Sequence, residues 1–403
     1  MKFFRIVEHI VNGAHTREYA TATVNGDADA GKIKLAVKQY IPLDNPNPQL
    51  GDELYEPLWD DLHQRLANSG VRIRSIWIAD MWNQGQSGVL NEKLLGNDPS
   101  WWDNTRDILA LITQKSDQMP HPLVGVGHSM GGAQLTLLAL SNPRLFHSLI
   151  LIDPIMQPLW SNSGIMPAIA STMRRDLWES RESAKAKFLQ SKFYQAWDPR
   201  VFDLWVKYGL REIPTELYPA GSAPAGSVTL TTTKHQELFV FLRPTFRKTN
   251  GKIIDRDPET DKAPPKGYPF YRPEPVYAFK KLPEVRPSVL YIFGGKSDAS
   301  TPDQRKLKLE RTGSGLGGSG GAKEGRVKEV VLDCGHLVAM EKVGETADAI
   351  SGWLKQEIQR WRNEQDDLQQ RWVKVDRREK MIIDEEWKRE VTPEVLRKKN
   401  PKL

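Results

Sequence analysis

The chain has 403 residues, with 57 basic and 51 acidic side chains and a formal net charge of +6. The basic excess is spread along the chain rather than gathered with aromatic residues, which argues against nucleic-acid binding. A single cysteine, Cys334, excludes an intramolecular disulfide, and the sequence has neither a membrane-spanning apolar run nor a secretory leader. We therefore expect a soluble intracellular protein with a core large enough to carry an insertion.

The first hundred residues predict two strands, a helix and a further strand. Residues 5–11 and 33–41 alternate irregularly between apolar and polar and resemble antiparallel edge strands. Helical spacing of apolar residues runs over 54–66, and residues 73–79 predict a buried strand. A second helix is expected over 101–112.

A strand, a tight turn and a helix follow next. Residues 122–126 form a short apolar run, and residues 132–140 are rich in Leu and Ala. Between them, Ser129 is flanked two residues away on each side by Gly127 and Gly131. This is the G-x-S-x-G pattern of a nucleophile elbow, in which small neighbours allow a strained turn that exposes the serine hydroxyl.

The strand pattern returns at three later places. Residues 149–154, 288–293 and 327–332 predict buried strands, and apolar residues over 350–361 predict a closing amphipathic helix. Strands that alternate with helices indicate a mostly parallel sheet with helices on both faces.

The interruption of this rhythm divides the chain. Residues 1–154 and 276–363 are expected to form the two parts of the α/β core, and residues 155–275 an inserted lid. Residues 364–403 carry charges of both signs and predict a solvated C-terminal extension.

A serine at such an elbow needs a histidine base that a carboxylate orients. His336 follows the last predicted strand in a glycine-containing loop and is the expected base. Asp153 and Asp298 each end a strand and precede His336, so both are candidates for the acid, and chain position slightly favours Asp298. The backbone N–H of Met130, at the start of the helix, is the expected oxyanion donor.

The segment Thr312–Gly321 matches a dinucleotide-binding fingerprint through Gly313, Gly315 and Gly318. A basic helical stretch precedes it and a charged loop follows, whereas the fingerprint joins a strand to a helix. We therefore expect a flexible connection and no bound cofactor, and the sequence predicts no metal site.

Taken together, the motifs resemble those of fungal peroxisomal α/β-hydrolases of secondary-metabolite and toxin biosynthesis. This group includes the acyl-CoA hydrolases of mycophenolic acid biosynthesis and the AK-toxin-type hydrolases. The resemblance covers nearly the whole chain and rests on these segments: Glu53–Asp60, Pro122–Ser129, Asp153-Pro154, Tyr271–Pro275, Gly313–Gly321 and Gly335–Leu337.

The resemblance implies an α/β-hydrolase fold with a lid and an acid that follows the strand after the elbow. It thereby moves the expected triad to Ser129, Asp153 and His336, with Asp298 in reserve. It also implies a serine hydrolase that cleaves an acyl-CoA thioester or ester of a fungal secondary metabolite through an acyl-enzyme. An acyltransferase on the same triad is an alternative.

The resemblance also bears on location. Pro401-Lys402-Leu403, preceded by basic residues, is similar to the S-K-L peroxisomal signal and would engage the peroxisomal import receptor. We expect the peroxisome, with the cytoplasm as the alternative. The oligomeric state is not predicted.

One departure from the family pattern concerns the core. A strand and a His-Gly turn, which supplies an oxyanion donor, are expected just before the helix at 54–66. Here residues 40–44 run through a Pro- and Asn-rich stretch, 45–48, directly to Gly51-Asp52. The sequence therefore predicts that one central strand is missing, through a gene-model error or in a catalytically weakened binding protein.

Overall fold

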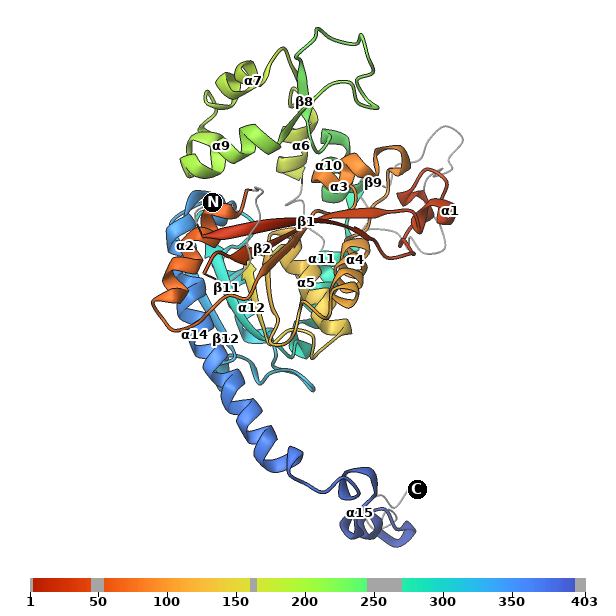
Figure 1. Ribbon diagram of the computed structural model, residues 1–403, viewed down its shortest axis with the longest axis vertical. Coiled ribbons are helices and arrows are strands. Elements are labelled where there is room, and N and C mark those ends of the chain that lie inside the picture. Colours follow the sequence, from red (N-terminus) through yellow and green to blue (C-terminus); the bar gives the residue numbers. More distant parts are fainter. Residues whose placement is uncertain (1–2, 45–53, 160–164, 245–269, 396–403) are drawn as a thin grey trace. The chain divides into compact units, whose positions relative to one another are not determined.

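A computed structural model describes residues 3–44, 54–159, 165–244 and 270–395. The chain divides into two compact units, Met1–Lys355 and Gln356–Leu403. The α/β core lies in the first unit (Figure 1). None of the helices in the described ranges is long and apolar enough to cross a membrane.

The core contains two separate sheets. One is antiparallel in the order β1-β2-β3, and the other is parallel in the order β12-β11-β5-β4. The strands are β1 (Phe4–Asn12), β2 (Lys34–Pro42), β3 (Ile76–Ala79), β4 (Val124–His128), β5 (Ser148–Ile152), β11 (Ser288–Gly294) and β12 (Val327–Leu332).

The break between the two sheets lies beside the elbow strand. Within the described residues, β3 pairs only with β2, and β4 pairs only with β5. All residues of β5 and β11 are buried, whereas every residue of β3 is half-buried and β4 alternates. The strand expected over 73–79 is present at Ile76–Ala79, but the expectation that it is buried is wrong, because β3 ends the antiparallel sheet. No strand lies between β3 and β4 within the described residues, and residues 45–53, where the sequence predicts the lack of a central strand, lie outside them.

Helices cover both faces of the parallel sheet, which confirms the predicted fold class (Figure 1). Ile150 and Ile292 pack on one face with helices α2 and α14, and Leu151 and Phe293 pack on the other with α4, α5 and α11. The principal core helices are α2 (Glu56–Ala67), α4 (Trp101–Gln114), α5 (Met130–Ser141), α11 (Pro273–Lys281), α12 (Pro302–Arg311) and α14 (Val343–Leu368). Shorter helices are α1 (Asp27–Ala30), α3 (Gly85–Leu90) and α13 (Val338–Glu341).

The segment between β5 and α11 has a core of its own. Trp178, Phe188, Phe202 and Val228 pack together there, beside a small sheet in the order β6-β8-β7. Its helices are α6 (Ile165–Met173), α7 (Arg181–Phe188), α8 (Lys192–Gln195), α9 (Pro199–Tyr208) and α10 (Lys234–Phe241). Its strands are β6 (Leu177–Trp178), β7 (Leu210–Glu212), β8 (Val228–Leu230), β9 (Arg243–Pro244) and β10 (Phe270–Tyr271).

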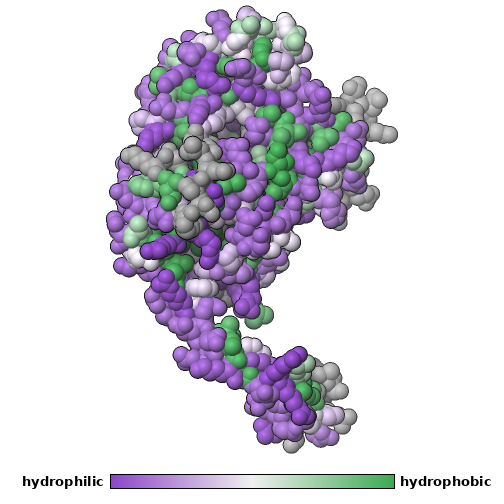
Figure 2. Space-filling model, viewed as in Figure 1, coloured by the Kyte–Doolittle hydropathy of each residue, from purple (hydrophilic) through white to green (hydrophobic). Residues whose placement is uncertain are grey.

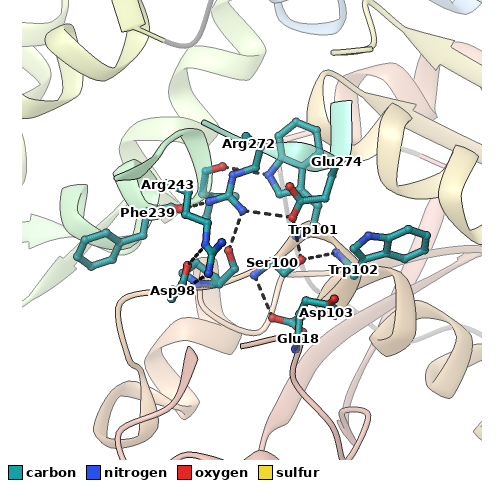
Figure 3. A network of polar contacts seen from close by, with 12 residues as sticks. Glu18, Asp98, Ser100, Trp101, Trp102, Asp103, Phe239, Arg243, Arg272 and Glu274 are labelled. Atoms are coloured by element: carbon teal, nitrogen blue, oxygen red, sulfur yellow. Dashed lines mark hydrogen bonds and ion pairs between the residues drawn. The ribbon is translucent and has the colours of Figure 1, made fainter. Parts of the chain in front are cut away.

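A buried polar network ties this segment to the start of α4 (Figure 3). Arg243 donates two hydrogen bonds of 2.8 Å to Asp98. Glu274 accepts from the Ser100 hydroxyl at 2.7 Å and from the Trp101 backbone at 2.9 Å. Arg272 donates to Glu274 and to the carbonyl of Pro99. The network therefore fixes the place where the segment returns to the core.

The glycine-rich segment after α12 is a folded turn. Gly313 and Gly315 donate to the carbonyls of Leu282 and Pro283, and Ser319 donates to that of Val285. The expectation of a flexible connection is wrong, because these backbone hydrogen bonds and several positive φ angles fix one conformation. The segment follows a helix and precedes strand β12, unlike a dinucleotide-binding turn.

The second unit contains the end of α14, a π-helical turn at Gln369–Val373, a 3-10 turn at Glu379–Met381 and α15 (Glu385–Glu390). Its described side chains are mostly exposed, including those of Trp372 and Trp387. Figure 2 shows that hydrophilic residues predominate on this unit, with a few hydrophobic ones among them.

Candidate active site

Ser129 lies at a strained turn between β4 and α5. Its φ of 55° is positive, which is uncommon for a residue with a side chain. A Cβ added to Gly127 would lie 2.6 Å from the carbonyl oxygen of Gly131, so the turn requires a glycine there. The turn has the geometry of a nucleophile elbow.

The backbone of Ser129 is also held by the neighbouring strand. Its N–H donates to the carbonyl of Ile152 at 2.8 Å, and its carbonyl accepts from Ile155 at 3.1 Å. Because β4 and β5 pair His128 with Ile152, the first residues after these strands, Ser129 and Asp153, are adjacent.

His336 lies between these two side chains. Its Nε2 is 2.7 Å from the Oγ of Ser129, and its Nδ1 is 2.6 Å from the Oδ2 of Asp153. The carboxylate can only accept when ionised, so Nδ1 carries the proton and Nε2 accepts from the serine hydroxyl. His336 lies 183 positions after Asp153 and 207 positions after Ser129 in the chain, so the fold brings distant residues together.

Asp153 is fully buried and surrounded by donors. It accepts hydrogen bonds from the backbone of Gly294 at 3.3 Å, from Ser297 at 2.5 Å and from Ser300. Burial acts to raise the pKa of the Asp153 carboxyl, but the bonds from His336, Ser297 and Ser300 outweigh it and hold that pKa below its usual value. The carboxylate is therefore ionised at neutral pH.

The structure brings Ser129, Asp153 and His336 together, while Asp298 lies elsewhere. The side chain of Asp298 is exposed, in the loop between β11 and α12. The same loop supplies Ser297 and Ser300 to Asp153. Sequence reasoning missed these two serines, since nothing in the motif distinguishes them from ordinary loop residues.

Met130 begins α5, so its backbone N–H lies at the positive end of the helix dipole. A group that develops negative charge beside Ser129 would be stabilised there. The residues at which the sequence lacks the second donor, 45–53, lie outside the described residues.

His128 is a second polar residue that sequence reasoning set aside. Its Nε2 is 2.9 Å from the backbone oxygen of His336, and its Nδ1 is 3.2 Å from the hydroxyl of Tyr55. A carbonyl oxygen only accepts, so Nε2 is the donor and Nδ1 accepts from Tyr55. Burial lowers the pKa of His128 to about 4, so the ring is neutral and holds the backbone of His336.

The arrangement can perform nucleophilic chemistry. The imidazole of His336 can take the proton of Ser129 as its oxygen attacks a carbonyl, while Asp153 holds the ring and stabilises its protonated form. The N-terminus of α5 can stabilise the resulting oxyanion.

Known proteins resemble this chain in sequence. A family model described as the alpha/beta hydrolase family matches residues 51–349. The type I acyl-CoA thioesterase mpaH' of Penicillium brevicompactum is 39% identical over 427 residues, covering 97% of this chain and 96% of that protein. The abhydrolase domain-containing protein ACTT2-1 of Alternaria alternata is 33% identical over 246 residues, covering 60% of this chain and 87% of that protein.

A solved structure has a similar fold. The peroxisomal alpha-beta-hydrolase Lpx1 of Saccharomyces cerevisiae superposes with a TM-score of 0.63 at 16% identity, covering 88% of this chain and 90% of that one.

The alignment with the Penicillium thioesterase also contains gaps in this chain. It spans 427 positions, more than the 403 residues of this chain, so that relative has residues without a counterpart here.

Proposed function

We propose that the chain, which belongs to the alpha/beta hydrolase family and acts on ester or thioester bonds, is a serine hydrolase that cleaves acyl-CoA thioesters. Its substrate would carry the acyl group of a fungal secondary metabolite. The observation that carries the proposal is the hydrogen-bonded chain from Ser129 through His336 to Asp153.

In this proposal the reaction has two halves. The oxygen of Ser129 attacks the thioester carbonyl and passes its proton to the Nε2 of His336, while the backbone N–H of Met130 stabilises the oxyanion. His336 then gives the proton to the departing thiolate of CoA, and the acyl group remains on Ser129 as an acyl-enzyme. Water, activated by His336, attacks the acyl-enzyme and regenerates Ser129.

The substrate class is supported by the names of the relatives. The Penicillium proteins that align over 97% of the chain are named type I acyl-CoA thioesterases. The Alternaria relatives carry only a domain name, so they bear on the family and not on the substrate.

We assign the inserted segment, residues 155–275, as a lid. It is attached close to the base, because the backbone of Asp198 donates to the carbonyl of Met340 at 2.8 Å, just beyond the loop of His336. A segment anchored there can limit the access of water and substrate to Ser129.

We place the reaction in the peroxisome. This part of the proposal rests on the sequence alone, namely on the basic residues at 397–399 and on Pro401-Lys402-Leu403. These residues lie outside the described residues. A fluorescent protein fused before Met1 should enter peroxisomes of a fungal host, and deletion of residues 401–403 should leave it in the cytoplasm. Equal peroxisomal import of both fusions would refute this signal.

The activity is tested with a panel of aromatic and aliphatic acyl-CoA thioesters and a reagent that reports the free CoA thiol. We expect turnover by the full chain and a loss of at least about 10³-fold in Ser129→Ala. Turnover that persists in Ser129→Ala would contradict the proposed nucleophile.

The divided sheet favours a second candidate, a weakened hydrolase that binds acyl-CoA without turning it over. That candidate predicts calorimetric binding of acyl-CoA with equal affinity in the wild type and in Ser129→Ala, and no thiol release from either.

A further inference from the structure

Lys308 is a buried lysine that the reaction described above does not use. It belongs to α12, and its side chain is fully buried. Its Nζ donates a hydrogen bond of 2.9 Å to the carbonyl oxygen of Pro154 and lies 5.4 Å from the centre of the Phe293 ring. A buried ammonium is costly unless another charge compensates it, so its place beside Asp153 calls for an explanation.

The carbonyl that Lys308 holds belongs to the turn that carries the acid. Asp153 has a positive φ of 41°, so this turn is strained. The same turn contacts the elbow, because a Cβ on Gly132 would lie 2.7 Å from the Cβ of Pro154. It also holds Ser129, whose carbonyl accepts from Ile155. The orientation of the peptide group between Pro154 and Ile155 therefore affects the positions of both Asp153 and Ser129.

The charges around Lys308 determine its state. Burial lowers the pKa of its ammonium to about 8, with the carboxylate of Asp153 opposing this shift and Arg305 of the same helix adding to it. Tyr291 of β11 reaches the same helix through its hydrogen bond to Thr312. Lys308 is therefore mostly protonated at neutral pH.

We propose that Lys308 is a positioning residue: its ammonium holds the Pro154 carbonyl, and its positive charge beside Asp153 opposes protonation of His336. This inference rests on the proposed roles of Ser129, Asp153 and His336. It predicts that His336 remains a free base to lower pH than it would without Lys308.

The test compares Lys308→Met and Lys308→Gln with Lys306→Met in the full chain. Met removes both the donor and the charge, whereas Gln removes the charge but keeps a donor. Lys306 is an exposed lysine of the same helix and serves as the matched control. The first readout is the low-field proton resonance of the His336 Nδ1–H, assigned by its loss in His336→Ala and followed against pH.

We expect the pH midpoint of that resonance to rise by about half a unit or more in Lys308→Met and Lys308→Gln, and to stay unchanged in Lys306→Met. An unchanged midpoint in the Lys308 variants, or an equal rise in Lys306→Met, would overturn the proposal. If Lys308→Met does not fold, Lys308→Gln decides.

The second readout is the rate at which a fluorophosphonate labels Ser129 as a function of pH. In both Lys308 variants we expect the acid limb of the labelling rate to shift to higher pH, as the midpoint of the resonance does. The maximal labelling rate should fall about tenfold or more in Lys308→Met. Labelling that is slower at every pH, with an unchanged acid limb, would mean that Lys308 has only a structural role and would overturn the proposal. A wild type that does not label would contradict the proposed function instead, and the resonance would still decide the role of Lys308.

Discussion

The carboxylate of Asp153 is buried among four donors, and one of them is the imidazole of His336. A buried carboxylate in this position holds the ring and balances the positive charge that His336 gains during the reaction. Its proposed role therefore differs from that of an aspartate that caps a loop.

Asp153→Asn should lower turnover by about 10²–10⁴-fold, because the amide cannot stabilise a protonated His336 and favours the wrong tautomer. Asp298→Asn is the matched control, since its exposed side chain lies in the loop that supplies Ser297 and Ser300, and its rate should stay within about twofold of the wild type. Rates measured at saturating substrate distinguish the two. A larger loss of turnover in Asp298→Asn than in Asp153→Asn would make Asp298 the acid instead.

His128 should make the stability of the fold depend on pH. Its pKa falls from 6.5 to about 4 through burial, so the unfolded chain binds a proton at this residue more readily than the folded one. The free energy of unfolding should therefore fall as the pH drops from 6.5 towards 4, by up to about 1.4 kcal/mol per pH unit from this group.

Urea unfolding of His128→Asn at several pH values checks this prediction. The variant should show a flatter dependence of the free energy of unfolding on pH over that range, and the exposed His121→Asn should behave as the wild type does. Parallel curves for the wild type and His128→Asn would rule out His128 as the source.

At the scale of the elements, Arg243 and Asp98 join the end of the inserted segment to the start of α4 (Figure 3). Both side chains are about 1% exposed, so neither charge can be compensated by water if its partner is removed. Glu274 and Arg272 extend the same network from the first turn of α11.

Arg243→Met should lower the free energy of unfolding by about 3–5 kcal/mol, because it leaves the carboxylate of Asp98 buried without the Arg243 guanidinium. Lys185→Met breaks the exposed pair with Asp203 in the same segment and should cost less than about 1 kcal/mol. Denaturant titration gives both values. Similar small losses would mean that the network contributes little to the attachment of the segment.

Elements with strong local patterns could be predicted from the sequence. The strand at Val327–Leu332 has the predicted bounds, and the elbow has the predicted order of strand, turn and helix. The glycine-rich turn could not be predicted, because its conformation depends on carbonyls of Leu282–Val285 that are distant in sequence. The network around Arg243 likewise joins residues 145 positions apart.

In the molecule as a whole, the core strands of the described residues form two sheets that separate between β3 and β4. The elbow strand β4 is consequently half-buried at three of its five positions, although β5 beside it is buried throughout. The break between β3 and β4 could be anticipated, because the sequence has no apolar run at a fixed place before α2. The inserted segment, which we propose to be a lid, could be predicted only as an interruption, since its short elements are stabilised by its own small core.

A chimera that carries, in place of residues 43–54, a strand and a His-Gly turn of the kind expected in this family should turn over substrate about 10²–10³-fold faster, the usual effect of one oxyanion donor. The free energy of unfolding should rise as well, because β3 and β4 would gain backbone partners. Thiol release and urea titration of this chimera measure both effects. A chimera no faster than the wild type would show that the divided sheet does not limit the reaction.

Labelling of Ser129 in the full chain by a fluorophosphonate, read by mass spectrometry of the peptide that contains it, is the most direct test of the proposed triad. We predict a label on Ser129 that disappears in His336→Ala, since His336 must take the serine proton. A folded chain that carries no label at Ser129, or one that labels equally well in His336→Ala, would contradict it.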